Sequence, residues 1–144
     1  MSVSSVHIHF LDIEPIELDP SRISSWYEKM AEAEAFMLSR IALNFCSDEH
    51  LLEMNKKHLK HDFYTDIITF DSSRPPVLKG ELYISLDRVK ENAIENQVVW
   101  ETELHRVMAH GLLHLMGYGD KSPEEKRVMR GKEEWALGIY SKSE

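Results

Sequence analysis

HGLLHLMGYGD, residues 110 to 120, is the stretch from which the rest of this sequence can be interpreted. His110 and His114 are four residues apart, so on a helix both imidazoles project from one face with β-carbons roughly 5–6 Å apart. Both can then reach one metal ion, at about 2.0–2.1 Å if the ion is zinc. Gly117 suits the left-handed position that ends many helices. The turn after it brings Asp120 back towards the histidines as a third candidate ligand.

The helix that carries these histidines is predicted to begin near Trp100. Apolar side chains recur along it at helical spacing and can face a core: Leu104, Val107, Met108, Leu112, Leu115 and Met116. A bare pair of histidines four residues apart more often marks two ordinary helix residues than a metal site. The turn to Asp120 favours the metal, because three protein ligands with an open fourth position are typical of a catalytic zinc.

Length and composition indicate a globular protein. The chain has 144 residues, of which 42% are hydrophobic and 29% charged, so we expect residues 1–144 to form a single domain. No apolar run reaches the about 18 residues of a membrane span, and we expect neither a membrane partner nor a signal peptide. The single cysteine, Cys46, cannot form an internal disulfide, which suits a reducing cytoplasm.

Alternation and capping signals predict the secondary structure. Strands are expected at residues 6–10, 36–46, 66–70 and 80–86. Helices are expected at residues 20–34, 48–55, 87–94, 100–116 and 123–136. Ser47 and Asp87 are the predicted N-caps of the second and third helices. Residues 122–125, Ser-Pro-Glu-Glu, form a capping box with proline at the first helical position.

This order predicts an α/β fold with a mixed sheet of about four strands and helices packed against it. The metal site would lie at the C-terminal end of a central helix. Because the connection between the third and fourth strands is short, at least one pair of strands should be antiparallel.

Three segments resemble the YbeY family of bacterial endoribonucleases. HGLLHLMGYGD resembles the metal-binding signature of that family, which usually reads His-Gly-x-Leu-His-Leu-x-Gly-Tyr-Asp-His. Asn55 followed by YTDIITF, residues 64–70, resembles its Asn and Pro-Thr-Asp-Val-Leu-Ser-Phe. GELYIS, residues 80–85, resembles its Gly-Asp-Ile-x-Ile-Ser strand. The resemblance spans roughly residues 50 to 120.

The resemblance implies a metal-dependent single-strand endoribonuclease that acts in 3′-end maturation of small-subunit ribosomal RNA and in ribosome quality control. Its partners would be ribosomal RNA and the small ribosomal subunit. The metal would be one Zn²⁺, or another divalent transition metal, bound by His110, His114 and Asp120. His114 and Lys60 are the expected catalytic residues.

The sequence departs from the family pattern at two places. Asp120 stands where the family has its third histidine, and Gly119 stands where the family has aspartate. A carboxylate can ligate zinc, but it is a harder donor than an imidazole and makes the identity of the metal less certain. Leu59 occupies the position of a family arginine implicated in RNA cleavage. Lys60 is adjacent, although a lysine lacks the guanidinium fork.

The formal net charge of −8 would repel a phosphate backbone, so RNA contact has to be local. The richest cationic stretch contains Lys56, Lys57, His58, Lys60, His61 and Arg74. The expected substrate-binding residues are Lys56, Lys57, Lys60 and Asp66. The same lysines could equally cover a solvated helix face. Three cations on the C-terminal helix are expected to lie far from the metal: Lys126, Arg127 and Arg130.

Two other functions stay open. In zinc peptidases of the HExxH type a glutamate follows the first histidine and acts as general base, and here that residue is Gly111. The chain could instead be a non-catalytic ribosome-assembly factor with a structural metal, which the leucine at position 59 favours. It could also be a metallohydrolase of another small substrate, which the acidic surface favours.

Overall fold

The structure is a computed structural model and describes residues 5–59 and 64–142. Its strands are β1 (Val6–Phe10), β2 (Met37–Cys46), β3 (Ile67–Asp71) and β4 (Val77–Ser85). Its helices are α1 (Pro20–Ala33), α2 (Asp48–Met54), the π-helical turn η1 (Asn55–Leu59), α3 (Leu86–Asn96), α4 (Trp100–Leu115) and α5 (Pro123–Lys142). The predicted order of strands and helices is confirmed. The one addition is η1, which continues α2 into the stretch expected to be a basic loop.

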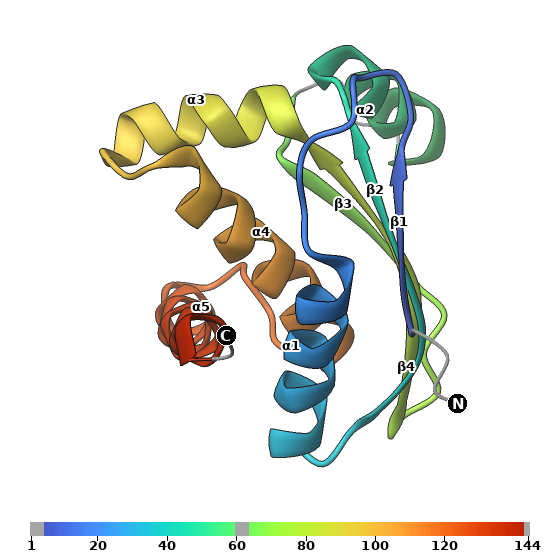
Figure 1. Ribbon diagram of the computed structural model, residues 1–144, viewed down its shortest axis with the longest axis vertical. Helices are drawn as coiled ribbons and strands as arrows, with labels where there is room; N and C mark the ends of the chain where they lie inside the picture. Colours follow the sequence, from blue (N-terminus) through green and yellow to red (C-terminus); the bar gives the residue numbers. More distant parts are fainter. Residues whose placement is uncertain (1–4, 60–63, 143–144) are drawn as a thin grey trace.

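The four strands form one mixed sheet in the order β1-β2-β4-β3. β1 and β4 both run parallel to β2, whereas β3 pairs antiparallel with β4. The short β3–β4 connection therefore gives the antiparallel pair that was predicted. β3 lies at one edge of the sheet, beside α4 (Figure 1).

Helices α1 and α4 cover one face of the sheet, and α5 packs against both of them (Figure 1). The main core fills the space between these layers, and two of its largest side chains are Trp26 and Tyr27. Their polar atoms are satisfied inside the core, since Trp26 Nε1–H donates to the Ala136 carbonyl at 2.8 Å and the Tyr27 hydroxyl donates to the Met108 carbonyl at 2.6 Å. These two bonds fix α1 against both α5 and α4.

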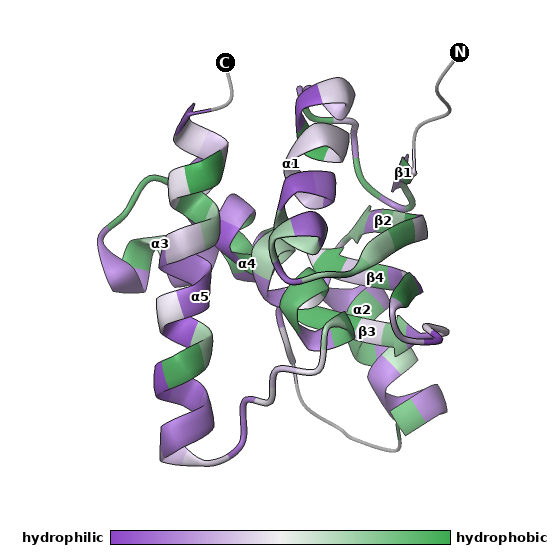
Figure 2. Ribbon diagram, turned by 90° about the horizontal axis from the view of Figure 1, so that it is seen from below, coloured by the Kyte–Doolittle hydropathy of each residue, from purple (hydrophilic) through white to green (hydrophobic). Residues whose placement is uncertain are grey.

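The colouring by hydropathy agrees with these layers. Figure 2 shows hydrophobic residues along the strands and hydrophilic residues over much of α5. A smaller cluster of Cys46, Leu51 and Ile68 lies apart from the main core. Within the described ranges, no helix combines the length and apolarity that a membrane span needs.

Three predicted boundaries were clearly wrong, and one of them is the end of α5, which continues to Lys142 instead of stopping at residue 136. β4 begins at Val77 rather than Gly80, because the bridge between Arg74 and Val77 starts the pairing directly after the turn. The N-cap of α3 is Ser85 rather than Asp87, since the Ser85 hydroxyl accepts a hydrogen bond from the Arg88 N–H at 3.1 Å. Asp87 lies in the first turn of α3 and accepts from the backbone N–H of residue 48 instead.

The other two capping predictions are confirmed. The Ser47 hydroxyl accepts from the N–H of residue 50 and caps α2. At the start of α5, Ser122 Oγ accepts from the Glu125 N–H at 3.1 Å, while Glu125 Oε1 accepts from the Ser122 N–H at 3.0 Å. This reciprocal pair is a capping box, and it fixes the direction in which the chain leaves the metal-binding stretch.

The chain reverses direction after the C-terminal end of α4. Gly117 has φ of 103°, a conformation that favours glycine. Its N–H donates to the His114 carbonyl at 3.0 Å, and the Tyr118 N–H donates to the Leu113 carbonyl at 3.1 Å. These two bonds are a Schellman motif, so Gly117 ends the helix as predicted.

Candidate metal centre

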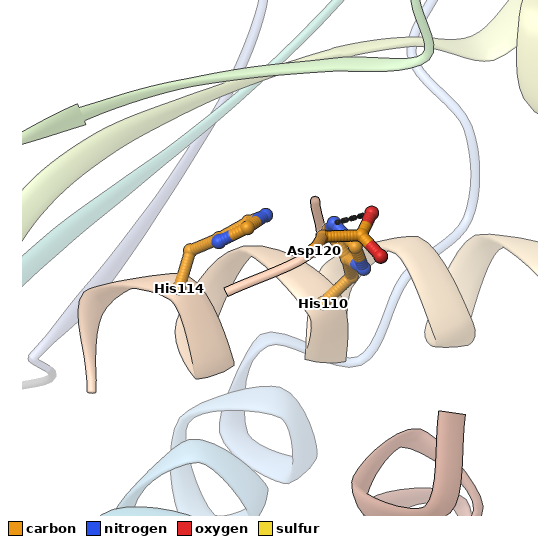
Figure 3. Close-up of side chains that lie close together, drawn as sticks. All are labelled: His110, His114 and Asp120. Carbon is orange, nitrogen blue, oxygen red and sulfur yellow. Dashed lines mark ion pairs between the residues drawn. The ribbon is translucent and has the colours of Figure 1, made fainter. Parts of the chain in front are cut away.

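His110, His114 and Asp120 converge at one place (Figure 3). Both imidazoles project from the same side of α4, with ring centroids 4.4 Å apart and planes nearly perpendicular at 83°. Asp120 follows the turn after α4, and its Oδ2 lies 3.6 Å from His110 Nε2. One potential ligand atom from each residue lies within 4.8 Å of the other two. The sequence prediction brought together the same three residues.

Hydrogen bonds fix which imidazole nitrogen is free to bind an ion. His114 Nδ1 lies 2.9 Å from the Tyr118 carbonyl, and His110 Nδ1 lies 2.7 Å from Glu133 Oε2. Both partners only accept, so both Nδ1 atoms carry the proton. When the rings are neutral, each Nε2 therefore keeps its lone pair, as in metal sites where the second ring nitrogen donates to a carbonyl or carboxylate.

Glu133 supports the centre from α5. It is buried, with 7% of its surface exposed, and its second oxygen, Oε1, lies 3.3 Å from Arg106 Nη1. Arg106 also pairs with Glu134 at 2.6 Å. One carboxylate thus connects the ligand helix α4 to α5 through His110 and Arg106.

The electrostatic surroundings of the centre favour positive charge. Burial opposes protonation of His110, but the hydrogen bond to Glu133 and the nearby Asp120 and Asp66 carboxylates together raise its pKa. Burial, followed by the charge of the neighbouring His110, lowers the pKa of His114. An arrangement of carboxylates that stabilises a proton at this point also stabilises a metal cation there.

The donor set fits a divalent metal. Two neutral imidazoles and one carboxylate suit zinc and other first-row transition ions. In a tetrahedral zinc site the ligand atoms lie roughly 3.4 Å apart. The distances between the three potential ligand atoms here, up to 4.8 Å, would therefore shorten slightly when an ion binds. The Asp120 side chain is 38% exposed, which leaves the solvent side open for a further ligand.

Two clefts border this site, and both are lined by Asp66, His110 and Asp120, whereas His114 lines only one of them. The larger one, here called the β3 cleft, has a volume of about 710 Å³. It is lined also by His114, by Lys121, by Asn55 and Leu59 of η1, and by Thr65, Ile67, Ile68, Thr69 and Asp71 along β3. Segments that are far apart in the sequence, each with its own family resemblance, thus border one cleft.

The smaller one, here called the α5 cleft, has a volume of about 310 Å³ and lies between α4 and α5. Its lining includes Lys126 and Arg130 together with His110 and Asp120. The expectation that these two cations lie far from the metal site was therefore wrong. It failed because α5 packs against α4, a tertiary contact that the pattern of α5 alone does not reveal.

The predicted substrate residues lie at different distances from the clefts. Asp66 lines both clefts, accepts a hydrogen bond from Asn92 Nδ2 at 3.3 Å, and has its pKa raised by burial. Lys56 and Lys57 are exposed on η1, the turn whose Asn55 lines the β3 cleft. Lys60 lies outside the described residues.

Sequence reasoning missed Glu133, Arg106 and Lys121. Glu133 carried a usable signal, because it falls on the same helical face as Met129 and Ala136, which are both buried. A carboxylate on an apolar stripe needs a buried partner. Nothing in the pattern pointed to His110 as that partner, since the two residues are 23 positions apart.

A mixed four-stranded sheet with two histidines and one carboxylate converging beside a cleft defines a class of α/β proteins that could hold one metal ion. The model of the family "Endoribonuclease YbeY" matches residues 10–141. A relative of that name from Cytophaga hutchinsonii is 48% identical over 120 residues, covering 83% of this chain and 84% of the relative. Another, from Phocaeicola vulgatus, is 41% identical over 125 residues, covering 87% and 91%. The chain belongs to the YbeY family.

The fold has a counterpart among solved structures. The solution structure of TM1509 from Thermotoga maritima superposes with a TM-score of 0.61 and 23% identity, over 94% of this chain and 88% of that protein. At this identity the likeness concerns the fold alone, and it agrees with the predicted α/β architecture.

Proposed function

We propose that this protein is a metal-dependent endoribonuclease that cuts single-stranded RNA during 3′-end maturation of small-subunit ribosomal RNA and in ribosome quality control. The observation that carries the proposal is the convergence of two imidazoles and the Asp120 carboxylate in a cleft lined by all three residues. Membership of the YbeY family supports the assignment to RNA.

His110, His114 and Asp120 would hold one divalent metal, for which zinc is the first candidate and another divalent transition metal the second. A bound metal supplies a water with its pKa lowered towards 7 and a Lewis acid for a phosphoryl oxygen. Glu133 and the Tyr118 carbonyl would hold the two imidazoles in the required tautomer and orientation.

The RNA strand would follow the β3 cleft, with Asp66 and the lysines at positions 56, 57 and 60 as its contacts. Phosphodiester cleavage needs a cation near the developing oxyanion, and we assign this role to Lys60. Gly111 stands where HExxH peptidases have their general base, and its position leaves no room for a side chain. A β-carbon there would lie 2.7 Å from Leu82 Cδ1. The missing glutamate argues against amide hydrolysis by the HExxH mechanism.

The proposal implies ribosomal RNA and the small ribosomal subunit as partners, and hence a cytoplasmic location. It treats residues 1–144 as one YbeY-type domain. The second candidate function is a non-catalytic ribosome-assembly factor with a structural metal. One observation favours it: Leu59, with 42% of its surface exposed, lines the β3 cleft at the position of the family arginine.

Repeated cleavage of RNA by one protein molecule distinguishes the endoribonuclease from the non-catalytic assembly factor. Metal-reconstituted protein should cut a labelled single strand that carries the 3′ end of small-subunit ribosomal RNA more than once per molecule, and His114→Ala should abolish cutting while the protein stays folded. Binding of that strand with no product, at full metal occupancy, would favour the assembly factor. Cutting of simple phosphoesters or peptides in preference to RNA would favour the third function, a metallohydrolase of a small substrate.

A further inference from the structure

The α5 cleft is not explained by the metal centre alone. It is lined by Lys126 and Arg130 of α5 at one side and by His110 and Asp120 at the other. Lys126 and Arg130 are four residues apart on a helix, so they project from the same face about 5–6 Å apart at their β-carbons. Both side chains are exposed. Two cations therefore face the space beside the candidate metal site.

Two neighbouring cations of α5 are neutralised by partners. Arg127 pairs with Glu124, with Nε 3.1 Å from Oε2, and Lys132 pairs with Glu34 at 2.8 Å. Within residues 5–59 and 64–142, by contrast, neither Lys126 nor Arg130 forms an ion pair. The unneutralised charge of this part of α5 is thus directed to the cleft.

Four carboxylates line the same cleft; three are occupied or buried, and the fourth, Asp120, lies with its Oδ2 3.6 Å from His110 Nε2. Glu133 is shared between His110 and Arg106. Glu103 is buried 3.9 Å from Arg106, and burial raises its pKa. Asp66 accepts from Asn92. None of these groups is paired with Lys126 or Arg130, so both cations are available to an anionic ligand.

We propose that Lys126 and Arg130 form a phosphate subsite on the α5 side of the metal centre, which binds a backbone phosphate of the RNA strand next to the bond that is cut. This inference rests on the proposed function. A guanidinium binds two phosphate oxygens through its fork, and the lysine one turn away adds a second charge. The strand would then cross the centre from the β3 cleft into the α5 cleft.

The subsite can be tested by binding, without turnover. The probe is a fluorescein-labelled single-stranded RNA, and anisotropy is measured in EDTA, where metal-dependent cutting is absent. The variant is Lys126→Ala with Arg130→Ala. The matched control is Arg127→Ala with Lys29→Ala, which removes the same charge from the paired residue on α5 and from an exposed residue on α1. Thermal unfolding and zinc content are recorded for each protein.

The cleft variant should bind the strand about tenfold more weakly than the parent protein. The slope of log affinity against log salt should fall by about 0.7 for each phosphate that the protein no longer neutralises. The control should match the parent protein in affinity, and Arg130→Lys with Lys126 intact should recover part of the affinity. Equal weakening in variant and control, or no weakening in either, would overturn the subsite. RNA cutting by the parent protein is scored separately, so failure of the proposed function remains distinguishable.

Discussion

Glu133 on α5 accepts a hydrogen bond of 2.7 Å from Nδ1 of His110 on α4, while its other oxygen faces Arg106. The carboxylate thereby fixes the tautomer of one candidate ligand and at the same time joins two helices. Replacement of Glu133 should affect metal affinity through orientation, because Glu133 itself is not among the three converging residues.

Glu133→Gln should weaken zinc binding by about 10–100-fold, the usual effect of losing the partner that orients a ligating histidine. The amide keeps the size of the side chain and can still accept a hydrogen bond, so the loss reports mainly the missing charge. Affinity is measured by competition with a chromophoric chelator. Glu134→Gln is the control, since Glu134 contacts Arg106 but not His110. Equal affinities in both variants would show that Glu133 has no influence on the metal.

Asp120→Ala should also weaken metal binding, because it removes the only carboxylate of the converging group. Asp120→His should keep the metal, since an imidazole can replace a carboxylate on zinc if the turn relaxes. Metal content after dialysis, measured by elemental analysis, distinguishes them. Unchanged affinity in Asp120→Ala would remove Asp120 from the ligand set. Loss of metal in a folded Asp120→His protein would show that this turn fits only the shorter side chain.

Lys60→Ala should lower RNA affinity and cleavage while metal content stays intact, because this lysine is proposed to contact phosphate rather than the ion. Removing Lys56, Lys57 and Lys60 together should flatten the salt dependence of binding by about 0.7 log units for each phosphate left without a cation. Lys29→Ala, on the exposed side of α1, is the appropriate control. If it weakens binding as much as Lys60→Ala, the stretch at 56–60 is only a solvated face.

The parts of the fold that depend on local patterns were predictable from sequence. Alternation identified β1 and β2, and hydroxyl caps located the starts of α2 and α5. The pairing of His110 with His114 is also local, because helical geometry alone puts them on one face. These predictions needed no knowledge of which elements pack together.

The remaining parts of the site depend on how α5 lies against α4. Glu133, Lys126 and Arg130 reach the centre only through that packing. A helix pattern shows which face is apolar, but it does not show which neighbour covers it. For the same reason the sequence does not show that Arg127 forms a surface ion pair, whereas Arg130, three residues later, lines the α5 cleft.

His105 should make stability depend on pH. Burial, followed by the charge of Arg22, lowers the pKa of His105 to about 4, against a weaker opposing effect of Glu101. Because the pKa of His105 is lower in the folded protein than in the unfolded chain, protonation of this residue favours the unfolded state. The contribution of His105 to the free energy of unfolding is therefore complete above pH about 6.5 and is lost as the pH falls towards 4. The free energy of unfolding, from urea titrations between pH 4 and 7.5, should therefore decline less steeply in His105→Gln.

The ring of His105 also packs against the Tyr140 ring, with centroids 4.1 Å apart and planes tilted by 34°. His105→Gln should for this reason lower stability at every pH, and only the difference in slope tests the titration. Identical slopes would place the acid-sensitive group elsewhere, for example at His114, whose pKa is also lowered.

Ala35→Gly should stabilise the protein. Ala35 joins α1 to β2 with φ of 65°, and the Phe36 N–H donates to the Ala31 carbonyl at 2.8 Å, as in the Schellman motif after α4. A left-handed backbone costs a residue with a β-carbon about 1 kcal/mol or more, whereas glycine adopts it freely. We expect a net gain of about 0.5–1 kcal/mol in the free energy of unfolding, reduced by the greater freedom of glycine in the unfolded chain.

Ala33→Gly makes the same chemical change two residues earlier, where the residue is exposed and still helical. It should lower stability by up to about 1 kcal/mol, because glycine is a poor helix former. Opposite signs for the two substitutions, measured by urea unfolding under one set of conditions, would establish that the left-handed backbone at Ala35 costs stability. A loss in both would mean that the turn between α1 and β2 relaxes to a conformation that alanine accepts.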